Sequence, residues 1–102
     1  MSGRIYHIAQ SDSWKLQRPS GKYRHPSLVT EGFIHCSLAE QVPGTLEKFF
    51  PSCEGLVLLE IDVARLSSEL RYENDYPHLY GPLDADAVVK ESPVAGFQLP
   101  VE

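Results

Sequence analysis

The chain has 102 residues, of which 42% are hydrophobic and 23% charged, and its formal net charge at neutral pH is −5. This length fits one domain over residues 1–102 that needs neither disulfides nor metal for its core. The acidic balance argues against general nucleic-acid binding and against binding to acidic membranes. Cys36 and Cys53 lack C-x-x-C spacing, and neither an export signal nor an 18-residue apolar run is present, so we expect a cytoplasmic protein with reduced thiols.

The first expected element is a short strand over residues 4–8, in which alternation places Tyr6 and His7 on opposite faces. His7 is then the first histidine with an interior position. Residues 11–13 offer several N-caps for a helical turn, and we expect its Trp14 to pack in the core.

The second feature is a basic segment, because residues 1–25 hold five basic residues and one acidic residue, whereas residues 26–102 hold four and 13. Residues 17–26 contain Pro, Ser and Gly and are expected to form a loop. If this loop folds over a pocket, Lys22 and Arg24 would contact ligand phosphates. Arg24 is the better candidate, because its planar guanidinium can bind two oxygens. The alternative is that these side chains neutralise the acidic remainder or serve solubility.

Residues 31–37 hold the most informative stretch of the chain. We expect a helical turn over residues 27–31 that ends at a left-handed Gly32. In the strand that follows, alternation places His35 and Ser37 on the face opposite Ile34 and Cys36. His35 therefore points away from the apolar layer. The alternative is a hydrogen-bonded structural histidine.

Ser37 and Glu40 match the Ser-x-x-Glu capping box, which predicts a helix beginning at Ser37. Pro43 and Gly44 are expected to interrupt that helix after about one turn. A second helix should then start at Thr45 and lay Leu46, Phe49 and Phe50 on the sheet until Pro51.

Residues 55–62 form the strongest strand pattern, apolar enough to be central, and residues 69–73 alternate as an edge strand. Residues 76–83 contain two prolines and a glycine, so we expect a stiff loop that displays His78 and Tyr80 on one side as a binding wall. The alternative is a stacking clasp over the sheet edge. A short closing strand is expected at residues 87–89.

Four of these segments, residues 5–7, 31–37, 58–62 and 77–83, together resemble an uncharacterised bacterial family catalogued as domain of unknown function 952. The resemblance spans nearly the whole chain. That family is remotely similar to the ADP-ribosyltransferase fold, which includes enzymes that remove a 2′-phosphate from transfer RNA with NAD. The resemblance implies an α+β fold with a small, split, mixed β-sheet and short helices.

The resemblance also implies roles for particular residues. Tyr6 and His7 match the first motif, whose histidine contacts NAD, and His35 and Ser37 match the second motif of the RNA phosphotransferase branch. Toxin-like members carry a catalytic glutamate on a late strand. Neither Glu73, on an expected edge strand, nor Glu91, near a proline, is a secure equivalent, so transfer to a protein side chain is disfavoured.

The leading hypothesis is a pocket between His7, His35 and the loop of His78 and Tyr80 that binds NAD, ADP-ribose or a phosphorylated nucleotide or RNA end. His35 and His78 are the acid–base candidates, because imidazole titrates near neutral pH. Tyr6, His7, Lys22, Arg24, Ser37 and Tyr80 are the expected ligand-binding residues. The alternatives are a non-catalytic ligand-binding or protein-interaction module and a metal site of His7, His35, His78 and Asp62, although no short zinc-type spacing is present.

Overall fold

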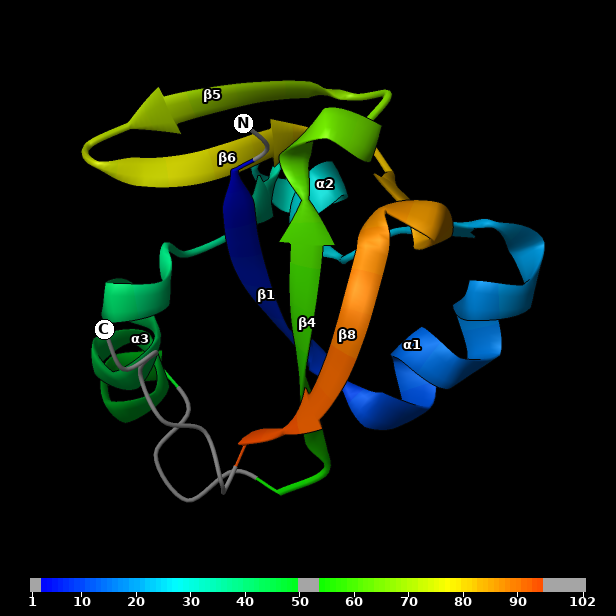
Figure 1. Cartoon of the computed structure of the whole chain (residues 1–102), viewed down its shortest axis with the longest axis horizontal. Helices are drawn as coiled ribbons and strands as arrows, with labels where there is room; N and C mark the ends of the chain where they lie inside the picture. Colours follow the sequence, from blue (N-terminus) through cyan, green and yellow to red (C-terminus); the bar gives the residue numbers. More distant parts are fainter. Residues whose placement is uncertain (1–2, 50–53, 95–102) are drawn as a thin grey trace.

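The computed structural model describes residues 3–49 and 54–94, and within them short helices surround small β-sheets in an α+β arrangement (Figure 1). The largest sheet has the order β1-β4-β8, formed by β1 (Arg4–Gln10), β4 (Leu56–Asp62) and β8 (Val88–Pro93). A second sheet has the order β3-β6-β5, formed by β3 (Ile34–His35), β6 (Tyr76–Tyr80) and β5 (Glu69–Glu73). A third pairs β2 (Lys22–Tyr23) with β7 (Leu83–Asp84).

Every strand pair among the described residues is antiparallel. The division into three small sheets confirms the expected split sheet. The expected mixed sheet is wrong, because these pairs are all antiparallel. No helix in the described ranges has the length and apolarity needed to cross a membrane.

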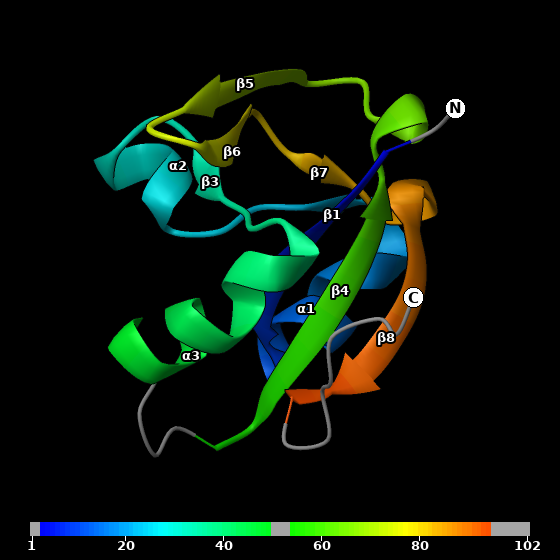
Figure 2. The same cartoon turned by 60° about the vertical axis from the view of Figure 1, so that its left-hand side comes forward.

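Strand β4 lies at the centre of the largest sheet and is packed on both faces, as its apolar run predicts. Leu59 and Ile61 belong to the larger core cluster, and Leu58 to the smaller one. Helix α1 (Ser11–Gln17) adds the buried Trp14 to the larger cluster, which confirms that prediction. Helix α3 (Val42–Phe49) adds Val42 to the smaller cluster on the other side of the sheet (Figure 2).

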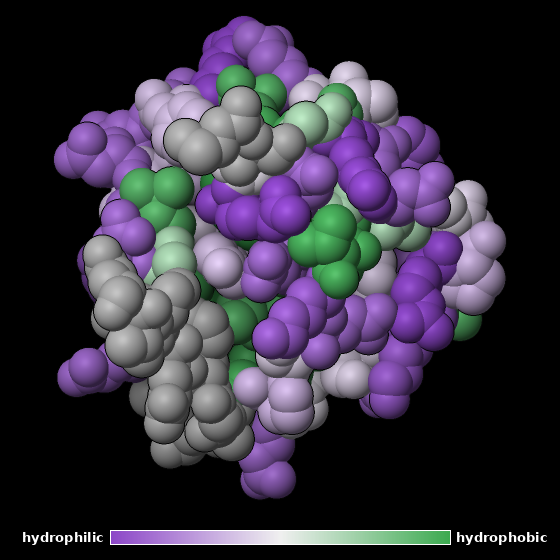
Figure 3. Space-filling view, viewed as in Figure 1, coloured by the Kyte–Doolittle hydropathy of each residue, from purple (hydrophilic) through white to green (hydrophobic). Residues whose placement is uncertain are grey.

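The face seen in Figure 1 carries mostly polar side chains, and its apolar patches are small and separate (Figure 3). The apolar side chains gather in the core, where residues such as Ile5, Ile34 and Leu79 are completely buried. Cys36 is also buried there as a free thiol, and burial raises its pKa to about 12. Cys53 lies outside the described residues.

Helix α3 differs from its prediction because it runs through Pro43 and Gly44 without a break. Pro43 stands in the first helical turn, where its missing N–H leaves no bond unmade. The turn before α3 is a 3₁₀ segment over Ala39–Gln41, and its cap is one residue later than expected, since the N–H of Leu38 donates to Gln41 Oε1 at 2.8 Å. Leu46 packs on the smaller cluster as predicted, whereas the side chains of Phe49 and Phe50 lie outside the described residues.

The segment expected to be a loop after β5 is mostly strand β6, so that prediction is wrong. Asn74 and Asp75 both have positive φ, 52° and 70°, and form a two-residue turn that returns the chain along β5. Pro77 is tolerated in this strand because β3 ends opposite it, so no strand hydrogen bond there requires an N–H from Pro77. The carbonyl of Pro77 accepts a hydrogen bond from the N–H of Cys36 at 3.0 Å. The backbone at Gly81 approaches Ser68 closely, because an added Cβ would lie 2.5 Å from Ser68 Oγ.

Three smaller predictions have clear outcomes. Helix α2 (Ser27–Thr30) and Gly32 with φ of 90° confirm the turn that precedes β3. The expected loop over residues 17–26 instead contains a 3₁₀ turn and strand β2, because Tyr23 is buried in the core. The closing strand begins at Val88 rather than Ala87 and extends to Pro93.

Candidate functional site

A cavity of about 560 Å³ opens between α3, the end of the β5–β6 hairpin and the segments next to α2 and β3. All four histidines of the chain line it. This volume falls within the range of small-molecule sites. The cavity is lined by His7, Ile8, His25, Glu31, His35, Cys36, Ser37, Thr45, Lys48, Glu73, Asn74, Tyr76 and His78.

His7 is the buried histidine of the cavity, because alternation along β1 turns it inward, 4% exposed. Its Nδ1–H donates to the carbonyl oxygen of His35 at 2.8 Å, and its Nε2 lies 3.3 Å from the Tyr23 hydroxyl, which donates to it. Burial lowers the pKa of His7 to about 4. His7 is therefore neutral at pH 7, with both ring nitrogens already bonded within the protein.

His25 is a cavity residue that the sequence interpretation did not select. The backbone N–H of Ser27 donates to its Nδ1 at 3.0 Å, so the neutral ring carries its hydrogen on Nε2. Its ring meets that of His7 edge-on, with centroids 5.4 Å apart. Burial lowers the pKa of His25, and the nearby His35 is a second, smaller cause of this lowering. The only signal in the sequence is its position before Pro26 and the helical turn.

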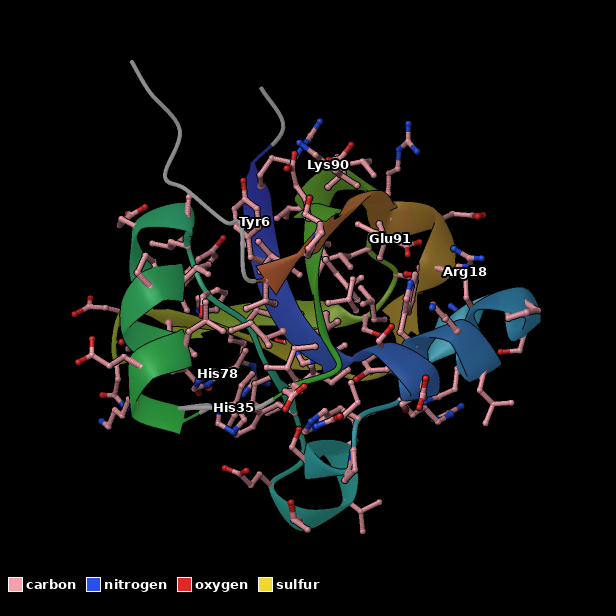
Figure 4. The ribbon with its side chains drawn as sticks, turned by 90° about the horizontal axis from the view of Figure 1, so that it is seen from below. Tyr6, Arg18, His35, His78, Lys90 and Glu91 are labelled. Atoms are coloured by element: carbon pink, nitrogen blue, oxygen red, sulfur yellow. The ribbon has the colours of Figure 1, made fainter. Side chains whose placement is uncertain are left out.

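His35 on β3 and His78 on β6 lie opposite each other on these two neighbouring strands. Their ring centroids are 5.4 Å apart, and Figure 4 shows the two side chains together near α3. Phe33 stacks on His78 with centroids 4.1 Å apart and also contacts His35 edge-on at 4.8 Å. The three rings thus hold both histidines in defined orientations.

Each of these two histidines is paired with a carboxylate that the sequence analysis did not assign. His35 Nε2 lies 3.0 Å from Glu31 Oε2, and His78 Nδ1 lies 2.8 Å from Glu73 Oε1. The Tyr80 hydroxyl also donates to Glu73 Oε1, at 2.6 Å. The hydrogen bonds from Tyr80 and His78 lower the pKa of Glu73, which keeps its carboxylate charged. Tyr80 is outside the cavity lining and acts on this carboxylate.

A different part of the cavity carries hydroxyls and a cation. Ser37 is buried, 5% exposed, and its Oγ lies 3.2 Å from Thr45 Oγ1 on α3. Lys48 stands one helical turn after Thr45 and also lines the cavity. Ser37 is fixed by its backbone, which exchanges two 2.7 Å hydrogen bonds with Tyr6.

The structure separates Tyr6 from the other expected ligand-binding residues. Its side chain belongs to the smaller core cluster with Leu58 and does not line the cavity, and Figure 4 shows it well away from His35 and His78. Alternation is the reason, since it places Tyr6 and His7 on opposite faces of β1. Of the expected Tyr6–His7 pair, only His7 lines this cavity, so the structure gives no support to a ligand contact by Tyr6 there.

The basic segment does not fold over the cavity. Lys22 forms an ion pair with Asp84 and donates to Ser67 Oγ at 3.1 Å, and Arg18 pairs with Glu91 at 2.7 Å (Figure 4). Lys22 and Arg18 are therefore each engaged by a carboxylate. Lys22 and Arg24 are both absent from the cavity lining, so direct phosphate contacts by either are not supported there.

The metal hypothesis also loses its proposed ligand set. Asp62 accepts the backbone N–H of Ala64 at 3.0 Å and pairs with Arg4 at 3.3 Å, away from the cavity lining. Among the described residues, no group of three or more His, Cys, Asp and Glu side chains is placed to hold a metal ion.

Fold and cavity together define a class: a small α+β protein of short helices and antiparallel sheets, with a cavity lined by histidines. The chain belongs to the family described as Protein of unknown function (DUF952), whose family model matches residues 8–91. This confirms the family resemblance seen in the sequence. No curated protein matches the chain.

Solved structures of protein CC0527 from Caulobacter crescentus are similar to this chain. Its X-ray structure has a TM-score of 0.80 and 31% sequence identity, covering 88% of this chain and 84% of that one. The X-ray structure of a double mutant has a TM-score of 0.80 and 30% identity with the same coverage. The solution NMR structure has a TM-score of 0.75 and 31% identity, covering 88% of this chain and 83% of that one.

Proposed function

We propose that the cavity binds a phosphorylated nucleotide, of which NAD, ADP-ribose and a phosphorylated RNA end are the leading examples, and that His35 and His78 carry out acid–base chemistry on it. The observation that carries this proposal is the pair of histidine–carboxylate contacts on neighbouring strands within one cavity. A carboxylate that holds one ring nitrogen orients an imidazole for proton transfer through the other.

The contacts leave one nitrogen of each ring for a ligand. Glu31 holds Nε2 of His35, and Glu73 holds Nδ1 of His78. The remaining nitrogens, Nδ1 of His35 and Nε2 of His78, have no hydrogen-bond partner among the described residues. Two imidazoles about 5.4 Å apart suit a reaction in which one accepts a proton and the other donates one.

Glu73 is our candidate for the acid that the resemblance to ADP-ribosyltransferases implies. The sequence interpretation set Glu73 aside as an edge-strand residue, yet it ends β5 inside the cavity. Its charged carboxylate is suited to stabilise positive charge that develops at a ribose carbon when nicotinamide leaves. We therefore favour ADP-ribosyl or RNA 2′-phosphate transfer with NAD as the reaction class.

The test is a ligand screen followed by product analysis. Thermal unfolding is measured with NAD, ADP-ribose, nucleoside monophosphates and short RNAs that end in a 2′- or 3′-phosphate, because a ligand of the folded state raises stability. Chromatography of NAD incubated with each RNA then detects nicotinamide release. We expect binding to persist and turnover to be lost in Glu73→Gln, with Glu69→Gln on the same strand as the control.

The outcomes separate the alternatives. Binding with no chemical change to ligand or RNA would make the protein a non-catalytic binding module. No stabilisation by any phosphorylated compound would reject the proposed ligand class altogether.

A further inference from the structure

We propose that Ser37, Thr45 and Lys48 form the phosphate subsite of the cavity, so that a nucleotide lies with its phosphate against α3 and its sugar towards Glu31 and Glu73. This inference rests on the proposed function and adds the orientation of the ligand. It also replaces the basic segment of residues 17–26 as the place where phosphate is recognised.

The first argument is the distribution of charge around the cavity. Among the described residues that line the cavity, Lys48 is the only lysine or arginine, and it lies on α3. The two lining carboxylates lie elsewhere, Glu31 just after α2 and Glu73 at the end of β5. Figures 1 and 2 both show the β5–β6 hairpin at the top of the molecule and α3 below it. A phosphate dianion is attracted to the α3 side and repelled by the carboxylates.

The second argument concerns hydroxyl hydrogens. Ser37 Oγ and Thr45 Oγ1 are 3.2 Å apart, and either hydroxyl could be the donor. One hydrogen serves that contact, so the hydroxyl that accepts keeps its own hydrogen for another acceptor. A phosphate oxygen next to the pair would take this hydrogen. Because backbone hydrogen bonds to Tyr6 hold Ser37 in place, the donor needs little ordering when the ligand binds.

The third argument concerns where the other basic side chains lie. Arg18, Lys22 and Arg24 do not line the cavity. His7 does line it, but it is neutral and both of its ring nitrogens are bonded to protein groups. Among the described lining residues, the lysine or arginine charge therefore lies on the α3 side.

The experiment compares adenosine 5′-monophosphate with adenosine, because the two differ by the phosphate alone. Isothermal titration at low ionic strength in a phosphate-free buffer gives both affinities for the wild-type chain, Lys48→Met and Thr45→Val. Lys15→Met is the control, since Lys15 is an exposed lysine on α1 outside the cavity lining. Circular dichroism establishes that each variant is folded.

We expect the wild type to bind the monophosphate more tightly than adenosine. Lys48→Met should weaken monophosphate binding by roughly tenfold or more, the loss that corresponds to one charge-assisted hydrogen bond, and leave adenosine binding unchanged. Thr45→Val should act in the same direction with a smaller loss, and Lys15→Met should have no effect. Added salt should reduce the effect of Lys48, because its side chain is exposed.

Two results would overturn the subsite. If the wild type prefers the monophosphate and Lys48→Met keeps that preference, phosphate binds elsewhere and the proposed function survives without this orientation. If the wild type binds neither compound, the subsite is wrong and the nucleotide proposal loses its simplest ligand at the same time.

Discussion

Glu73 Oε1 accepts hydrogen bonds from both His78 Nδ1 at 2.8 Å and the Tyr80 hydroxyl at 2.6 Å. The hairpin creates this arrangement, because the Asn74–Asp75 turn brings the end of β5 beside the start of β6. Alternation along β6 then places His78 and Tyr80 on one face, two residues apart. A carboxylate at the end of an edge strand thereby becomes the partner of a cavity histidine.

Replacing Tyr80 by Phe should raise the pKa of Glu73. The Tyr80 hydroxyl is the strongest of the groups that lower that pKa, since a hydrogen bond to the charged form favours it. The pKa can be followed by NMR titration of the Glu73 side-chain carboxyl carbon. Tyr72→Phe is the control, because Tyr72 is an exposed tyrosine on the same hairpin. An unchanged Glu73 pKa in Tyr80→Phe would show that this bond does not persist in solution.

Stability should fall as the pH is lowered from about 6.5 towards about 4, because of His7. Burial lowers its folded-state pKa from 6.5 to about 4, so the unfolded chain binds more protons across this interval. The folded state therefore loses up to about 3 kcal/mol relative to the unfolded state. Urea unfolding at a series of pH values measures the change.

The matched variant for this effect is His7→Gln, whose amide keeps a donor for the His35 carbonyl without a titrating ring. It should be less stable than the wild type at pH 7, and its stability should depend less on pH between about 6.5 and 4. A wild-type slope equal to that of His7→Gln would mean that His7 titrates normally when folded.

Much of the fold could be predicted from local patterns. The apolar run of β4 identified a central strand, and alternation placed Ile34 in the core and His35 outside it. Strand β6 was missed because Pro77 suggests a loop, and its tolerance depends on where β3 ends. Asn74 and Asp75 directly follow the expected edge strand, and they form the turn of a hairpin that the expected loop did not include.

The cavity was harder to predict than the fold. His7, His35 and His78 line one cavity as expected, although His78 reaches it from strand β6 and not from the expected loop. Glu31 and Glu73 stand at the ends of elements, where no periodicity applies, so nothing local singles them out. The ion pair of Lys22 could not be predicted from local sequence, because its partner, Asp84, is 62 residues away.

Lys22→Ala should lower stability and leave ligand affinity unchanged. Asp84 accepts hydrogen bonds from Lys22 and from the backbone and side chain of Ser67, which joins β7 to the segment before β5. Burial alone would raise the pKa of Asp84, but the bonds from Lys22 and Ser67 outweigh burial and lower it. We expect a loss of about 1 kcal/mol in urea unfolding, the size of one net hydrogen bond.

The control for this prediction is Lys15→Ala, which removes an exposed lysine of α1. Titrations with adenosine 5′-monophosphate and adenosine then test affinity. A selective loss of monophosphate binding in Lys22→Ala would return phosphate recognition to the basic segment and contradict the arrangement described above.

His35→Gln should reduce turnover, or ligand affinity where no turnover occurs, far more than it reduces stability. The His35 side chain is 52% exposed, and the group that holds His7 is its backbone carbonyl, which the substitution leaves in place. We therefore expect unfolding free energy to change by no more than about 0.5 kcal/mol, as for other surface substitutions. Loss of a general acid or base should lower turnover by roughly a hundredfold or more. A large drop in stability with unchanged affinity and turnover would make His35 a structural residue, as the neutral and buried His7 is.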